Sequence, residues 1–555
     1  MDDATRLDRL AEEYWDRAMA TSPTTATLLG DHRFDDRLPR LDPDSLQQQR
    51  DDLVATASAA RALDLDDPSD RLTRDLLVHE ADEGIAHLDL EIQTGAIDPF
   101  LGVHTGLVQA ASQTGAATAE QADALLERHR QVPRLFDEVA ARNRDRMGRG
   151  LTPAAICVER VVGQVEAYLA SDLDDDPFVA ITVPDEVADD WRDRMRTLVD
   201  EVVRPAYAAH LQFVRDEVLP VARDDEHVGL MHQPGGDERY ATLARMHTSL
   251  DVDPEEVHQI GRIDAEEELP REWDEIGRSA LGVGDLPTLF ERLRTDEDLR
   301  YADGDAMVAH AEEVIERAWA AIDGWFAARP QAPCQVKPVP ASLAPAMPPA
   351  YYFPPAEDGS RPGTYFINTH EADERGRYLY EGIAFHEAIP GHHFDRTLAQ
   401  ELTDVPTFRR YGSHTAHAEG WGLYTERLAD EMGLYSSDLD RLGMLSADAW
   451  RAGRLVVDTG LHAKGWSRQQ AIDWMVRWTP IPRAVIEQEV DRYIGMAGQA
   501  LSYKMGQRHI FQLRSEAQQA LGPDFDIAAF HDAVLVRGGM PLDLLTASVH
   551  DQLGM

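Results

Sequence analysis

Residues 380–394 read Tyr-Glu-Gly-Ile-Ala-Phe-His-Glu-Ala-Ile-Pro-Gly-His-His-Phe, and the interpretation of the chain depends on them. In zinc peptidases with the pattern His-Glu-x-x-His, two histidines one helical turn apart bind the metal. The glutamate that follows the first of them activates water. Here His386 and Glu387 are present, but Pro390 stands where the second histidine belongs and has no ligand atom. The literal pattern is therefore absent.

Two histidines follow the proline, and either could be the second ligand. Pro390 removes a backbone donor and Gly391 tolerates unusual dihedral angles, so we expect the helix to bulge here. A bulge that absorbs two residues would bring His392 to the ligand position, and one that absorbs three would bring His393 there. We favour His392 and keep His393 as the alternative. Three histidines and a glutamate this close together are more typical of a metal site than of isolated core side chains.

A third ligand is expected from a later helix, since a catalytic zinc site uses three protein ligands. Residues 414–426 read His-Thr-Ala-His-Ala-Glu-Gly-Trp-Gly-Leu-Tyr-Thr-Glu. Glu419 lies between small residues, where a carboxylate can approach an ion, so it is the better ligand. Glu426 stands beside an arginine and is interpreted as part of a solvated helix face. His414 and His417 are competing donors, although each is more typical of a partly exposed polar side chain.

The rest of the sequence predicts a mainly α-helical protein. Apolar residues recur with the 3.6-residue period of helices along most of the chain, for example over residues 304–328 and 482–521. Prolines are too frequent between residues 330 and 355 for a helix, and strand formers follow at residues 363–369. We therefore expect a small β element before the metal-binding helix. The expected division is a helical part that forms one cleft wall, residues 1–329, and a catalytic part, residues 330–555.

The composition argues against several classes of partner. With 54 Lys and Arg against 100 Asp and Glu, the formal net charge is -46. A field of that sign repels nucleic acids and anionic membrane surfaces. The two cysteines are too few for a disulfide framework, and neither a secretory leader nor a membrane-spanning run is recognisable, so we expect a cytoplasmic protein. The sequence does not indicate the oligomeric state.

Four motifs together resemble the bacterial family called domain of unknown function 885. They are His-Glu-x-x-Pro-Gly-His-His at 386–393, Glu-Gly-Trp-Gly-Leu-Tyr at 419–424, Val-Asp-Arg-Tyr at 490–493 and Gly-Gln-Ala-Leu-Ser-Tyr-Lys at 498–504. The likeness runs through nearly the whole chain. That family is similar to the gluzincin metallopeptidases, mainly helical enzymes with a deep cleft. The resemblance implies a zinc site of His386, His392 and Glu419, with Glu387 as the general base.

The later motifs contain candidates for the remaining parts of a hydrolytic site. Tyr503 is the candidate donor to an oxyanion, and a tyrosine packed in the core is the alternative. Arg454 and Arg492 are candidates for binding a carboxylate with two nitrogens each. Lys504 is a further carboxylate-binding candidate, although an exposed surface lysine is the simpler interpretation. One helix carries a polar stripe that either lines a cleft or faces solvent: Arg451, Arg454, Asp458 and His462.

We therefore expect a zinc-dependent hydrolase that cleaves short peptides, with Glu387 taking a proton from water and Tyr503 stabilising the oxyanion. Cobalt or manganese could replace zinc, because two histidines and a carboxylate accept either. One alternative is a metal-dependent amidase that acts on a small metabolite conjugate. Another is a helical protein with a non-catalytic metal site. The sequence does not indicate the end from which a peptide would be cleaved.

Overall fold

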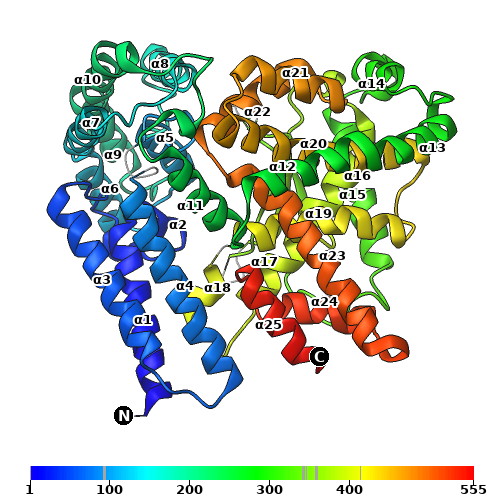
Figure 1. Cartoon of the computed structure of the whole chain (residues 1–555). Helices are drawn as coiled ribbons and strands as arrows, with labels where there is room; N and C mark the ends of the chain where they lie inside the picture. The colour runs from blue at the N-terminus through cyan, green and yellow to red at the C-terminus, as the bar shows by residue number, and fades with distance from the viewer. Residues whose placement is uncertain (1, 92–95, 341–343, 345–346, 357–360, 413) are drawn as a thin grey trace. The chain divides into compact units, whose positions relative to one another are not determined.

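The computed structural model describes residues 2–91, 96–340, 344, 347–356, 361–412 and 414–555. The protein is mainly helical, as predicted, with one three-stranded sheet (Figure 1). It divides into two compact units, the first made of Met1–Arg239 with Gly465–Arg468 and the second of Tyr240–Lys464 with Gln469–Met555. Among the described residues, no helix combines the length and the apolar character needed to cross a bilayer.

The first unit is built of helices. They are α1 (Asp3–Thr21), α2 (Pro23–Leu28), α3 (Pro43–Arg61), α4 (Pro68–Leu90), α5 (Val103–Gln113), α6 (Ala119–His129), α7 (Val132–Gly148), α8 (Ala155–Ala170), α9 (Ala188–Leu198) and α10 (Arg204–Phe213), with α11 (Gly236–Thr248) spanning the boundary. The long helices α3 and α4 pack side by side, as the blue part of Figure 1 shows. Asp42 and Asp67 cap them by accepting backbone N–H groups of the first turn, directly before a proline.

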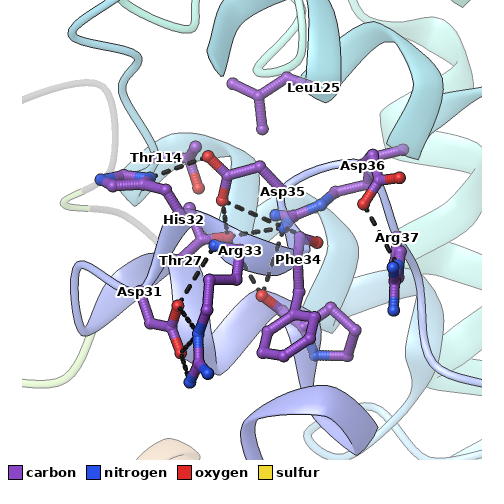
Figure 2. A network of polar contacts seen from close by, with 12 residues as sticks. Thr27, Asp31, His32, Arg33, Phe34, Asp35, Asp36, Arg37, Thr114 and Leu125 are labelled. Carbon is purple, nitrogen blue, oxygen red and sulfur yellow. Dashed lines mark hydrogen bonds and ion pairs between the residues drawn. The ribbon is translucent and has the colours of Figure 1, made fainter. Parts of the chain in front are cut away.

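A buried polar network holds the short helix η1 (His32–Phe34) in the first unit. The Asp35 carboxylate accepts a hydrogen bond from the Thr27 hydroxyl at 2.6 Å and lies 2.8 Å from Nδ1 of His32 (Figure 2). Arg128 of α6, also buried, donates to the Thr27 hydroxyl at 2.6 Å and to the Phe34 carbonyl at 3.1 Å. The Asp35 carboxylate lies 3.6 Å from Arg128 and compensates its buried charge, so loss of either partner would leave an unpaired charge in the core.

The second unit contains the sheet and the remaining helices. They are α12 (Pro254–Ile263), α13 (Leu269–Leu281), α14 (Leu286–Thr295), α15 (Gly304–Ala320), α16 (Tyr380–Glu387), α17 (His392–Gln400), α18 (Thr407–Tyr411), α19 (Thr415–Glu431), α20 (Asp438–Ala463), α21 (Arg468–Trp478), α22 (Arg483–Gly495), α23 (Ser502–Leu521), α24 (Ile527–Leu535) and α25 (Leu542–Leu553). The longest, α20, is buried along most of its length and packs against α12 and α13. Helices α19 and α23 pack along one another (Figure 1).

The small β element expected before the metal-binding helix is present. It consists of β1 (Cys334–Pro338), β2 (Ala350–Phe353) and β3 (Gly363–Ile367), with β3 in the centre, parallel to β1 and antiparallel to β2. Tyr365 of β3 is fully buried and pairs with Tyr352 of β2. Pro345, one of the prolines between residues 330 and 355, lies outside the described residues. Strand β2 packs against α16, the helix that carries His386, and therefore lies beside the candidate site.

Three features differ from the sequence-based expectations. The helix expected over residues 304–328 ends at Ala320, and the one expected over 482–521 is interrupted between α22 and α23. At that interruption the buried Asp458 carboxylate accepts the backbone N–H of Gly498 at 3.0 Å. The compact units divide at Arg239 and Tyr240, not at residue 330. The reason is that α12 and α13 pack on α20, while α15 packs on α16, so these helices belong with the C-terminal half.

Candidate metal centre

The polypeptide breaks between the two histidines of the motif. Helix α16 ends at Glu387 and α17 begins at His392, with a cis peptide bond before Pro390. The helical bulge expected here is therefore wrong, because the chain ends one helix and starts another. Gly391 makes the turn possible: a Cβ atom at this position would lie 1.8 Å from the carbonyl oxygen of His386.

The break brings three potential ligands together. His386 of α16, His392 of α17 and Glu419 of α19 each offer an atom within 4.8 Å of the other two. Nε2 of His386 lies 3.3 Å from the Glu419 carboxylate, and Nε2 of His392 lies 3.7 Å from it. The two imidazole rings are nearly perpendicular, at 84°. Two imidazoles and one carboxylate are the donor set of many catalytic zinc sites, so these residues fit a divalent ion.

Glu426 fixes the orientation of the first histidine. Its carboxylate lies 2.9 Å from Nδ1 of His386, and only 2% of its side chain is exposed. The expectation that Glu426 belongs to a solvated face is therefore wrong. A carboxylate on Nδ1 leaves Nε2 available as a ligand. The signal for this role was in the sequence, since Glu419 and Glu426 are seven residues apart, two helical turns, and share one face of α19.

Helix α19 approaches α16 closely because a glycine faces the histidine. A Cβ atom at Gly422 would lie 2.6 Å from Nε2 of His386. The indole N–H of the neighbouring Trp421 donates to the carbonyl of Pro390 at 2.9 Å and ties α19 to the break in the chain. The Gly-Trp-Gly part of the sequence thus positions the metal-ligand candidates without itself contributing a ligand atom.

The charges of the group are strongly coupled. Burial alone would lower the pKa of His386, but its hydrogen bonds to Glu419 and Glu426 outweigh burial and raise that pKa to about 9. Burial would raise the pKa of Glu419, yet the hydrogen bond with His386 and nearby positive charges lower it to about 2. Burial and then the positive charge of His386 lower the pKa of His392 to about 4. An anionic Glu419 beside these imidazoles is a favourable place for a cation.

Glu387 differs from the other carboxylates near the site. Burial raises its pKa to about 7, and the negative charge of Glu419 adds to this, while His386 and Arg451 oppose it. The backbone N–H of Tyr352 donates to it. A carboxylate whose pKa lies near neutrality is suited to accept and return a proton.

His393 lies apart from the group. Its Nδ1 atom is 2.8 Å from the hydroxyl of Tyr352 and 3.3 Å from that of Thr397, and its side chain is buried. Of the two alternatives for the second ligand, the geometry therefore brings His392 and not His393 to His386. His417 is also buried and lies 3.6 Å from the Asp395 carboxylate, so the expectation of a partly exposed side chain is wrong for it. Half-buried His414 precedes α19 and is not among the three grouped donors.

A cavity of about 570 Å³ opens onto the group. Its walls come from β2, α16, α17, α19, α20, α22 and α23, and it contains Glu387, Tyr503, Arg454 and Arg492. Arg454 and Arg492 both donate to Glu489, at 2.8 and 3.2 Å. The polar stripe on α20 is not a solvated face. Arg451 and Arg454 line the cavity, whereas Asp458 and His462 are fully buried.

Lys504 does not line this cavity. It is buried, and its ammonium group forms ion pairs with Asp448 and, at 3.6 Å, with Asp264. The expectation that Lys504 binds a substrate carboxylate in the cavity is therefore corrected. Because neighbouring residues of a helix point about 100° apart, Tyr503 can line the cavity while Lys504 faces a different part of the unit.

The comparisons with known proteins show the family through a family model and the fold through solved structures. The family described as "Bacterial protein of unknown function (DUF885)" matches residues 23–549. The crystal structure of a "putative lipoprotein" from Colwellia psychrerythraea has a TM-score of 0.93 at 24% identity, over 100% of both chains. A "putative lipoprotein of unknown function" from Shewanella oneidensis has a TM-score of 0.76 at 18% identity, over 98% of this chain and 99% of the other. At these identities the likeness shows the fold alone. No curated protein matches the chain.

Proposed function

The chain belongs to the bacterial DUF885 family, and on that premise we propose that it is a metal-dependent hydrolase of the zinc-peptidase kind, acting on short peptides. One observation carries this proposal: His386, His392 and Glu419 converge at a cavity that also contains Glu387. The combination of a three-ligand set and an adjacent carboxylate is what metal-assisted hydrolysis requires. We further propose that the helical fold is gluzincin-like and that the cavity is its substrate cleft.

Each residue of the site has a separate task in the proposed reaction. A zinc ion, or cobalt or manganese in its place, would polarise the carbonyl and make water more acidic. Glu387 takes a proton from the attacking water and passes it to the leaving amine. Tyr503 donates its hydroxyl hydrogen to the oxyanion that forms at the carbonyl. Glu426 keeps His386 in the tautomer that offers Nε2.

The experiment combines metal analysis with hydrolysis. The purified protein is loaded with zinc, its metal content is measured by mass spectrometry, and it is incubated with a mixed library of short peptides. We expect one ion per chain and cleavage of peptides. The Glu387→Gln variant should keep the ion and lose turnover by roughly a hundredfold or more, since it removes the general base.

Three outcomes would contradict the proposal in different ways. Turnover retained by metal-loaded Glu387→Gln would overturn the role of Glu387. An intact ion with no hydrolysis of any peptide would indicate a non-catalytic metal site, whereas hydrolysis of small amide conjugates alone would indicate an amidase. A cytoplasmic location and the absence of nucleic-acid and membrane partners remain predictions, which fractionation of the source cells would test.

A further inference from the structure

The wall of the cavity has the opposite charge from the rest of the chain. Seven arginines and four glutamates line it, whereas the whole chain has 54 basic against 100 acidic residues. Two of the glutamates are Glu387 and Glu419, which belong to the candidate metal centre. The cavity wall therefore carries more positive than negative side chains although the chain as a whole is acidic, and such a wall favours an anionic substrate.

Two of these arginines form a pair beside the metal centre. Arg451 and Arg454 lie one turn apart on α20, and both guanidinium groups lie near the same two rings. Their central carbons are 5.2 and 5.0 Å from the centre of the Trp450 ring and 5.8 and 4.4 Å from that of Tyr503. Aromatic faces hold guanidinium groups in a defined plane and leave their edges available for hydrogen bonds.

The pair is incompletely neutralised. Arg454, 5% exposed, donates to Glu489 at 2.8 Å, but Arg492 shares the same carboxylate. The Arg451 side chain, 15% exposed, has its nearest carboxylate at Glu426, 4.0 Å away, and that group already serves His386. Nη1 of Arg454 and Nε of Arg451 are buried donors with no hydrogen-bond partner among the described residues. Buried donors of this kind favour an anion that can accept from both.

We infer that Arg451 and Arg454 bind the free carboxylate at the carboxyl end of a peptide, so that the enzyme removes the terminal residue or dipeptide. This inference rests on the proposed hydrolase function and adds the substrate class. The placement follows from two observations: Tyr503, the candidate oxyanion donor, stacks on both arginines, and both arginines line the same cavity as Glu387 and Glu419. The anion site and the reacting carbonyl are therefore neighbours.

The reaction balances as an ordinary hydrolysis. The C–N bond of the scissile amide breaks and a C–O bond forms with water. One proton of the water ends on the leaving amine, and the released fragment carries the carboxylate that the arginines held. No oxidant, reductant or other co-reactant is required.

The test compares pairs of N-acetylated tripeptides that differ only in having a free carboxylate or a carboxamide at the carboxyl end. Binding to zinc-loaded Glu387→Gln protein is measured by calorimetry, and hydrolysis by the wild-type protein is followed by mass spectrometry. We expect the acid to bind about tenfold or more tightly than the amide, the range of a charge-assisted hydrogen bond. We also expect products released from the carboxyl end. Equal binding and equal turnover of acid and amide would overturn the inference.

Binding and turnover separate this inference from the proposed function. Preferential binding of the acid with no turnover of either peptide would support the anion site and refute the hydrolase. Turnover of both peptides at equal rates would support the hydrolase function and refute the anion site. The Arg451→Gln variant should lose most of the preference for the acid while binding the amide as before. Arg441→Gln is the matched control, since Arg441 lies on the same helix outside the cavity, paired with Asp430.

Discussion

His386 and Glu426 are joined by a buried hydrogen bond, with 2.9 Å between Nδ1 and the carboxylate oxygen and at most 5% of either side chain exposed. The bond lies on the side of the imidazole away from Glu419, whose carboxylate faces Nε2 at 3.3 Å. One ring nitrogen is thus held by the protein and the other is directed into the group of potential ligands. This arrangement fixes the tautomer and the ring orientation of His386 before any ion binds.

The first prediction concerns that bond. Glu426→Ala should weaken zinc binding by roughly tenfold to a hundredfold, because His386 loses the partner that sets its tautomer and orientation. Zinc affinity is measured by competition with a chromophoric chelator. Glu431→Gln is the control, since Glu431 lies on the same helix and pairs with Arg514 at a half-exposed position. Unchanged affinity in Glu426→Ala would show that the bond does not support the metal centre.

The second prediction separates the two adjacent histidines. His392→Ala should abolish stoichiometric zinc binding, because it removes one of three ligand atoms. His393→Ala should keep one ion per chain and lower the stability instead, since His393 bonds to Tyr352 in a buried position. Metal analysis after gel filtration measures the first effect, and urea unfolding measures the second. The opposite pattern would make His393 the ligand.

The third prediction concerns the close approach of two helices. Gly422→Ala should lower zinc affinity sharply while leaving the protein folded, because the new methyl group would lie 2.6 Å from Nε2 of His386 and displace the ring. Gly163→Ala on α8 is the control, since a Cβ atom there meets nothing within 4 Å. That control should bind zinc normally and gain about 0.5–1 kcal/mol of stability from helix propensity.

The fourth prediction is that Lys504 contributes to the stability of the fold and not to substrate binding. Lys504→Met should lower the free energy of unfolding by about 3 kcal/mol, because it leaves the buried Asp448 with a single cationic partner. Peptide turnover should stay close to that of the wild-type protein. Lys464→Met, which removes a more exposed ion pair with Glu255, should lower the stability much less than Lys504→Met does. A large loss of substrate affinity in Lys504→Met would restore it as a substrate-binding residue.

The fifth prediction tests the candidate oxyanion donor. Tyr503→Phe keeps the ring on which Arg454 stacks, 4.4 Å from its centre, and removes only the hydroxyl group. We expect kcat to fall by roughly a hundredfold with little change in KM, the pattern of an interaction made only in the transition state. A change in KM alone would instead indicate that the hydroxyl binds the substrate in its ground state.

Much of the fold could be predicted from the sequence, because the 3.6-residue spacing of apolar residues that indicates a helix is a local pattern. The helical content, the small β element after the proline-rich segment and the family could all be predicted. The end of α15 and the break before α23 could not be predicted. At that break the backbone N–H of Gly498 donates to Asp458, a residue forty positions earlier in the chain. The division into compact units likewise depends on which helices pack together, and the order of the helices along the chain does not predict this.

For the site, the sequence by itself determined the chemistry: a histidine followed by glutamate, a second histidine after a Pro-Gly break, and a carboxylate on a later helix. Only the tertiary structure decided which atoms meet. It brings His392 and Glu419 to His386, turns His393 to Tyr352 and Lys504 to Asp448, and places Glu426 behind the first ligand. The physical reason is that residue types and spacing are local, whereas the direction of a side chain depends on how separate helices break and pack against one another.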